Sequence, residues 1–336
     1  MSNRHSCRDG VKMLKRITLD FKIANCQYRC LHCDGAKNDE CGNIPIQKIK
    51  EIVHSFLQHK GSLFENLFVF ISDSAFLYND FPALVGFLNK HGIRYKKEPI
   101  NGAIYDKSFF KLKFPEIAKS SLDSVRITLF GLEATHNKFA GHRDSFNELI
   151  KIARAFTNCN KHIIFHLYIT PESITEIDIL KNYLVSEFSK STITYEYSNC
   201  YKGNYYRRHH FLLTEPHREM ARKWDLSLVS ENEFVESFKG KRPIIWHKNL
   251  WIRAFSNGDC QVAIFPLGSF YQAMNLNSSS PETIIQKCIA LVQDMENKLP
   301  SFDRLIDEVY DPEDPFLYSP SDALSLWWAR YIREKG

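Results

Sequence analysis

The chain has 336 residues, of which 44% are hydrophobic and 25% are charged, a composition typical of globular proteins. Its formal net charge of +5 is modest and identifies no class of partner. No unbroken apolar run is long enough to cross a bilayer, and the basic N-terminus lacks the apolar stretch of a secretory signal. We therefore expect a cytoplasmic protein without membrane partners.

Strands alternate with helices over the first 190 residues, according to the hydrophobic periodicity. The predicted strands are Ile17–Phe21, Leu67–Ile71, Ile93–Lys97, Val125–Leu129 and Ile163–Thr170, and the predicted helices are residues 45–59, 81–90, 145–156 and 174–188. Ser145 and Glu148 have the spacing of a capping box at the start of the third helix. Five or six such units predict an α/β fold with a partial or full barrel, whose functional residues collect at the carboxyl ends of the strands.

The pattern changes after about residue 200. Asn257-Gly258 lies between two apolar segments, residues 250–255 and 261–265, and predicts a β-hairpin. Further helices are predicted at residues 215–223, 282–297 and 321–334, with a proline-rich loop between the last two. We divide the chain into an N-terminal tail (1–14), a barrel (15–230) and a small α+β extension (231–336) that covers the open side of the barrel.

Three cysteines follow the first predicted strand directly. Cys26, Cys30 and Cys33 have the spacing C-x3-C-x2-C, so their thiolates can hold three corners of a 4Fe–4S cluster and leave one iron open. A closed zinc site completed by Cys41 or His32 is the first alternative. A ferredoxin-like electron carrier is the second, although it needs a fourth cysteine at another spacing. The scattered cysteines are expected to be small buried hydrophobic residues; they are Cys159, Cys200, Cys260 and Cys288.

The cysteine motif resembles that of the radical S-adenosylmethionine (SAM) superfamily, where CxxxCxφC follows the first barrel strand. His32 occupies the φ position. The resemblance implies a partial (β/α)6-type TIM barrel, one 4Fe–4S cluster on Cys26, Cys30 and Cys33, and SAM bound beside it. It also implies reductive cleavage of SAM to a 5′-deoxyadenosyl radical that abstracts hydrogen from a substrate. Flavodoxin or ferredoxin would then supply the electron.

The turn after the second strand departs from the family pattern. Many members carry a GGEP-like motif there, whose backbone and acid hold the SAM amino group. This chain has Ile-Ser-Asp-Ser-Ala at residues 71–75. The resemblance places Ser72 and Asp73 at the SAM amino group, whereas the alternative is that Asp73 only caps the next turn.

Later segments resemble the family in the same order. Thr128 stands where a SAM-contacting serine is common in the fourth strand, and His166 and Thr170 of the fifth strand should also face the cofactor. Residues 136–146 resemble the "HD…RG…GSF" run of peptide-modifying members.

Residues 250–288 resemble a SPASM or twitch extension. Leu267 replaces a cysteine expected there, so we expect no auxiliary cluster.

Three functions remain open. The first is maturation of a ribosomally made peptide by epimerisation, crosslinking or a related reaction, which the extension and residues 136–146 favour. Against it, the barrel begins too near Met1 for a fused peptide-recognition domain, so a separate protein would supply one. The second is dehydrogenation or epimerisation of a sugar, aminoglycoside or other metabolite. The third is a cluster- and SAM-binding protein that has lost catalysis. Nucleic acid is not expected as a partner, because the basic and aromatic run at residues 205–210 is typical of an exposed loop.

Overall fold

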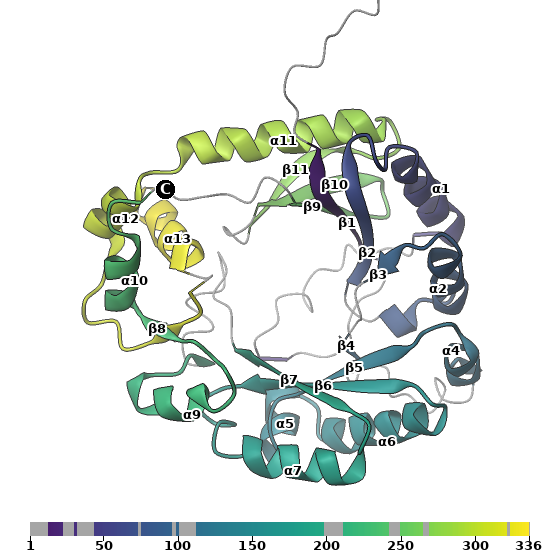
Figure 1. The fold of residues 1–336 in the computed structure, drawn as a ribbon, viewed down its shortest axis with the longest axis horizontal. Coiled ribbons are helices and arrows are strands. Elements are labelled where there is room, and N and C mark those ends of the chain that lie inside the picture. The colour runs from purple at the N-terminus through teal and green to yellow at the C-terminus, as the bar shows by residue number, and fades with distance from the viewer. Residues whose placement is uncertain are drawn as a thin grey trace, which may run out of the picture.

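The computed structural model describes residues 13–22, 30–31, 44–72, 75–95, 99–100, 112–197, 211–241, 249–264, 269–320 and 323–335. Its elements form a ring in which the strands of the two large sheets lie inside the neighbouring helices, and α10, α12 and α13 complete the ring on the left (Figure 1). The strands are β1 (Leu14–Lys22), β2 (Phe64–Ser72), β3 (Arg94–Tyr95), β4 (Pro99–Ile100), β5 (Ser124–Leu129), β6 (His162–Ile169), β7 (Thr192–Tyr197), β8 (Val229–Ser230), β9 (Asn249–Ala254), β10 (Asp259–Ile264), β11 (Ser269–Asn275) and β12 (Leu317–Tyr318). The helices are α1 (Ile46–Leu57), α2 (Phe81–Lys90), α4 (Phe114–Lys119), α5 (Glu133–Ala140), α6 (Ser145–Asn158), α7 (Ile177–Glu187), α9 (Arg218–Arg222), α10 (Glu231–Phe238), α11 (Pro281–Lys298), α12 (Phe302–Val309) and α13 (Ala323–Lys335), with 3₁₀ turns η2 (Ala75–Leu77) and η5 (Glu215–His217). None of the described helices is both long and apolar enough to cross a bilayer.

The barrel strands run parallel in chain order. One sheet has the order β11-β10-β9-β1-β2-β3 and the other has the order β4-β5-β6-β7. Only three residues separate β3 from β4, so together they occupy the position of the third barrel strand. β3 pairs with β2, and β4 pairs with β5. The described strands end at β7 on one side and β11 on the other, so they form no closed barrel. The predicted partial (β/α)6-type barrel is confirmed.

β1 and β5 each have an apolar outer face and a more polar inner face. In β1, Ile17, Leu19 and Phe21 are fully buried in the core that also contains the apolar faces of α1 and α2. The alternate residues, among them Asp20, lie on the inner face. Because side chains alternate along a strand, each wall of the barrel can pack against helices outside and carry functional groups inside.

The C-terminal hairpin extends the first sheet. The predicted hairpin is confirmed as β9 and β10, joined by a turn in which Gly258 has φ +89°. A β-carbon at Gly258 would lie 2.0 Å from the Asn277 side chain, so glycine is required there. β9 pairs in parallel with β1, on the side away from β2. The hairpin therefore joins the barrel through backbone hydrogen bonds, and its inner-face residues continue the first wall.

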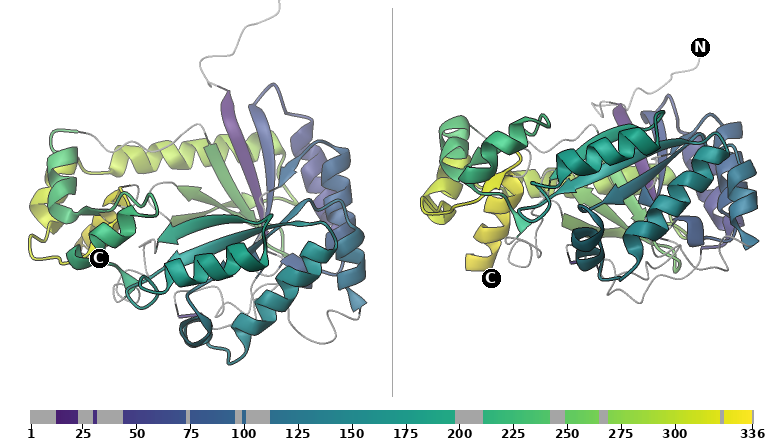
Figure 2. Two further views of the ribbon diagram at one scale, coloured as in Figure 1. Left: turned by 60° about the horizontal axis from the view of Figure 1, so that its bottom comes forward. Right: turned by 90° about the horizontal axis from the view of Figure 1, so that it is seen from below.

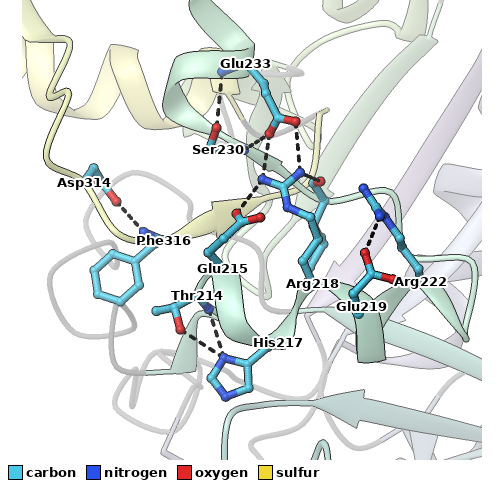
Figure 3. A network of polar contacts seen from close by, with 11 residues as sticks. Thr214, Glu215, His217, Arg218, Glu219, Arg222, Ser230, Glu233, Asp314 and Phe316 are labelled. Atoms are coloured by element: carbon cyan, nitrogen blue, oxygen red, sulfur yellow. Dashed lines mark hydrogen bonds and ion pairs between the residues drawn. The ribbon is translucent and has the colours of Figure 1, made fainter.

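Residues 211–241 pair with residues 302–335 in a C-terminal helical layer. β8 and β12 are antiparallel, and the Leu317 N–H donates to the Leu213 carbonyl at 2.8 Å. Arg218 donates to the carboxylates of Glu215 and Glu233, each at 2.8 Å (Figure 3). Figure 2 shows α10, α12 and α13 gathered at the end of the molecule opposite α1 and α2. The predicted boundary at residue 230 falls within this layer, between β8 and α10.

Two local predictions are wrong. Asp144, not Ser145, is the N-cap of α6, and it makes no side-chain capping bond; the Ser145 hydroxyl instead lies 2.9 Å from His136 Nε2. Cys159 is exposed, because it follows the end of α6 at the surface. The expected burial of Cys260 and Cys288 is confirmed.

Candidate active site

The carboxyl ends of the barrel strands form a common rim, and the cysteine loop starts from it. Lys22 and Ser72, the last residues of β1 and β2, are paired in register. The segments that follow β1 and β2 in the sequence, one with the cysteine motif and the other with Asp73, therefore begin at neighbouring strand ends. Of the predicted ligands, Cys30 is described, whereas Cys26 and Cys33 lie outside the described residues, as do His32 and Asp73. Ser72 is described by its backbone alone.

Cys30 lies against an apolar cluster at the ends of β5 and β6. It is half-buried and packs on Phe130, Phe139, Ala140, Tyr168 and Phe211. The Leu31 N–H donates to the Phe139 carbonyl at 2.9 Å. Phe130 directly follows β5 and Tyr168 is near the end of β6. The contacts hold one thiol of the predicted cluster site at the rim, next to strands four and five of the barrel.

His136 packs against the apolar cluster of side chains that contacts Cys30. Its ring stacks on Phe130 with centroids 5.3 Å apart, and its Nδ1 accepts a hydrogen bond from the Phe130 N–H at 3.1 Å. Nε2 therefore carries the proton and donates to the Ser145 hydroxyl at 2.9 Å. His136 is 1% exposed, and burial lowers its pKa to about 3. This neutral histidine positions the aromatic surface under Cys30.

Glu176 fixes the turn between β5 and α5. Its carboxylate accepts from the Leu132 N–H and the Thr135 hydroxyl, each at 2.7 Å. Gly131, in this turn, has φ +136°, and a β-carbon there would lie 2.6 Å from a Glu176 carboxylate oxygen. The close approach of a carboxylate to the backbone explains why a glycine follows the fourth barrel strand here.

The inner face of β5, β6 and β7 brings several predicted and unpredicted residues together. Thr128 pairs with His166, and His166 pairs with Thr194. His166 Nδ1 lies 2.8 Å from the Thr194 hydroxyl, and its Nε2 is hydrogen-bonded to the Glu196 carboxylate. The Glu196 side chain is 42% exposed, so this pair is accessible from inside the barrel. Thr128 and His166 are thus neighbours on the face where the sequence placed them.

Thr170 has local partners. It is 1% exposed, and its backbone N–H donates to the Ser173 hydroxyl at 2.9 Å. Its own hydroxyl lies 3.2 Å from both the Ser173 hydroxyl and the Ser173 backbone nitrogen. Its contact with SAM stays a prediction.

Sequence reasoning missed Glu196, Glu176 and the pair formed by Asp20 and Arg253. Arg253 Nε donates to Asp20 at 2.9 Å, and Asp20 is fully buried on the inner face of β1. Glu196 was accessible to prediction, because the alternation in residues 192–197 places it on one face with Thr194. The other contacts join segments far apart in sequence and have no local signal.

The residues present fit a 4Fe–4S cluster. The thiol of Cys30 lies at the rim in an apolar setting, which suits a cluster thiolate, and the loop that carries Cys26 and Cys33 starts from the same rim. Among the described residues, no three histidine, cysteine or acidic side chains group as metal ligands. Cys41 and His32, the candidate fourth ligands of a closed zinc site, lie outside the described residues.

No protein-family model and no curated protein matches this sequence. Solved structures do match it. The enzyme anSMEcpe, in a structure titled with bound AdoMet and the Cp18Cys peptide, matches with a TM-score of 0.58 and 13% identity over 95% of this chain and 96% of that chain. Streptococcus suis SuiB bound to the precursor peptide SuiA matches with a TM-score of 0.55 and 14% identity over 91% of this chain and 75% of that chain.

A second SuiB structure, with a TM-score of 0.50, is matched over 74% of this chain and 60% of its own length. The chain therefore spans about 60% of SuiB in that structure. Both similar proteins are radical SAM enzymes. At these identities the likeness establishes the fold. The chain has an incomplete (β/α)6-type barrel, and its fold is similar to that of these two proteins.

Proposed function

We propose that the chain is a radical SAM enzyme. The observation that carries the proposal is the position of Cys30, which the apolar cluster holds at the carboxyl rim of a partial (β/α)6-type barrel with the C-x3-C-x2-C spacing. When bound by Cys26, Cys30 and Cys33, one 4Fe–4S cluster would supply the electron that cleaves SAM to a 5′-deoxyadenosyl radical.

The chain's own residues position and enclose the reactants in this proposal. His136 and Phe130 keep Cys30 at the rim, and Glu176 fixes the turn beside it. Thr128 and His166 face the inside of the barrel within reach of a cofactor at the rim. The turn of Ser72 and Asp73 would receive the SAM amino group, since it leaves the sheet beside the cysteine loop.

We further propose a ribosomally made peptide as the substrate, modified by epimerisation, crosslinking or a related reaction. Support comes from the two similar structures, in which anSMEcpe binds the Cp18Cys peptide and SuiB binds the precursor peptide SuiA. Flavodoxin or ferredoxin would deliver the electron, and the reaction would take place in the cytoplasm. The alternative substrate is a sugar, an aminoglycoside or another metabolite.

Anaerobic reconstitution tests the proposal. The protein should hold about four irons per chain and, with dithionite, convert SAM to 5′-deoxyadenosine. Cys30→Ala should lose both iron and product. The matched control is Cys159→Ala, because Cys159 is exposed and far from the motif in sequence, and it should behave like the wild type. Iron uptake without deoxyadenosine would indicate a lapsed enzyme, and full iron content in Cys30→Ala would exclude the assigned ligand.

A further inference from the structure

The inner face of β5 carries three polar side chains in succession. The outer-face residues Val125, Ile127 and Leu129 are buried in the core. Ser124, Arg126 and Thr128 therefore lie on the opposite face, toward the inside of the barrel. Thr128 is the predicted SAM contact, while the other two have no role in the mechanism above.

In two of these side chains a buried polar atom lacks a hydrogen-bond partner in the described part of the chain. Arg126 Nε and the Ser124 hydroxyl are both buried without a partner among the described residues. Arg126 also forms no ion pair within the described part of the chain. Unpaired buried donors are costly and rare, so two on consecutive inner positions of one strand indicate a group that is supplied from outside the fold.

The carboxylates on the inner faces of the described barrel strands pair with side chains other than Arg126. On the described inner faces of β1, β2, β5, β6, β7 and β9 the acidic residues are Asp20 and Glu196, which pair with Arg253 and His166. Arg126 is level with Ile164 and Glu196 with Tyr168, so Arg126 and Glu196 are two strands and four residues apart. That offset is about 10 Å across the sheet and about 13 Å along it, too far for a direct pair.

The same inner faces carry more positive than negative charge. Their cationic residues are Arg16, Lys22, Arg126 and Arg253, against the two carboxylates Asp20 and Glu196. Arg16 lies over the Phe68 ring at 5.4 Å, which confirms its inward direction beside β2. A low-dielectric wall with excess positive charge attracts an anionic ligand.

We propose that Arg126, together with the neighbouring Ser124 hydroxyl, binds a carboxylate group of the substrate. The guanidinium fork matches a carboxylate, and the Ser124 hydroxyl adds a further donor. Arg126 lies two residues deeper than Thr128, about 7 Å further from the rim, so it serves the substrate and not SAM. The inference rests on the proposed function, because it assumes that substrate enters the barrel below SAM. The carboxylate belongs to an acidic side chain or to a peptide C-terminus.

Binding of three short probes distinguishes these cases. Dansyl-labelled Gly-Ala-Glu-Ala-Gly amide, Gly-Ala-Gln-Ala-Gly amide and Gly-Ala-Gln-Ala-Gly free acid are titrated into the cluster-loaded protein with SAM, followed by fluorescence anisotropy. At least one carboxylate probe should bind roughly tenfold more tightly than the neutral amide, as a charge-assisted bond in a partly buried site requires. Which of the two binds better identifies the source of the carboxylate.

Variants connect the preference to Arg126. Arg126→Gln should abolish it and Arg126→Lys should retain part of it, while Arg154→Gln, on the outer helix α6, should not change it. Equal binding of all probes by the wild type would overturn the inference, as would a preference that survives in Arg126→Gln. Loss of SAM affinity in Arg126→Gln would also overturn it, since Arg126 would then hold the cofactor. If Arg126→Gln does not fold, the wild type and Arg126→Lys decide. Failure of the proposed function is seen separately, as missing iron or missing 5′-deoxyadenosine.

Discussion

The buried ion pair of Arg330 and Glu231 in the C-terminal helical layer is fully hydrogen-bonded, whereas the inner face of β5 contains a buried guanidinium nitrogen, Arg126 Nε, without a partner among the described residues. In the helical layer Arg330 donates to both Glu231 oxygens, at 2.7 and 2.8 Å, and also pairs with Asp314. Trp327 Nε1 donates to Glu231 at 2.9 Å. On β5, Arg126 Nε has no partner in the described part of the chain. A buried network in which every polar group is hydrogen-bonded stabilises the fold, whereas a buried polar group without a partner can bind a ligand.

The rim of the barrel contains both fully hydrogen-bonded polar groups and a carboxylate that is accessible to a ligand. His136 and Glu176 are saturated by the backbone and by neighbouring hydroxyls, so they maintain the shape of the rim. Glu196, hydrogen-bonded to His166, is 42% exposed and accessible to a ligand. The following substitutions test two expectations. Replacing a polar group whose hydrogen bonds are all made within the fold should lower stability, and replacing one with open hydrogen-bonding capacity should weaken ligand binding.

The largest effect is expected from Arg330→Met. It leaves Glu231 buried without its cation, which should lower the free energy of unfolding by about 3–5 kcal/mol. Chemical denaturation measures it. Lys298→Met, in an exposed pair with Asp294, is the control and should unfold like the wild type. A loss below about 1 kcal/mol for Arg330→Met would mean that the network contributes little to the fold.

Acid should destabilise the protein through His136. Its pKa is lowered to about 3 by burial, whereas in the unfolded chain it is about 6.5. Between these values the unfolded state binds more protons, so stability falls as pH falls, by up to about 1.4 kcal/mol per pH unit from this group. Denaturation curves from pH 7 to 4 should be flatter for His136→Gln than for the wild type. Identical pH slopes would contradict the buried neutral histidine.

Gly131→Ala should be more damaging than Gly92→Ala. Both glycines have positive φ, but a β-carbon at Gly92 meets nothing within 4 Å, whereas at Gly131 it meets Glu176 and Thr135 below 3 Å. We expect about 1 kcal/mol for the backbone term in either case, and a further loss at Gly131 from displacement of Glu176. Thermal unfolding measures the difference. Equal losses would show that the Glu176 turn tolerates displacement.

The smallest effects separate Thr128 from Thr170. Thr128→Val should weaken SAM binding by roughly tenfold or less, because one hydrogen bond is lost. Thr170→Val should mainly lower stability, by about 1 kcal/mol, because Ser173 loses its partner. SAM titration and thermal unfolding of both variants distinguish them. A weaker SAM affinity for Thr170→Val alone would reverse the two roles.

Local pattern predicted the barrel strands well. Residues 163–170 and 67–71 are apolar runs bounded by helices, and such runs fix a buried strand without distant information. The glycine at Gly258 likewise marked its hairpin, because the turn needs positive φ.

Long-range pairing had no local signal. β9 joins β1 more than 200 residues away, and the ion pair between Asp20 and Arg253 follows from that register. Ser145 has the sequence signature of a cap, but the ring of His136, nine residues earlier, competes for its hydroxyl. Tertiary contacts of this kind override local propensity, and they account for most of the site residues that sequence reasoning missed.

Electron paramagnetic resonance of the reduced, reconstituted protein tests the central claim most directly. A single cluster on Cys26, Cys30 and Cys33 leaves one iron open, so the spectrum should show one reduced 4Fe–4S species that changes when SAM is added. Cys30→Ala should remove this signal, and Cys159→Ala should retain it with the same response. A spectrum that does not respond to SAM, or a cluster signal that persists in Cys30→Ala, would contradict the assignment of this barrel to radical SAM chemistry.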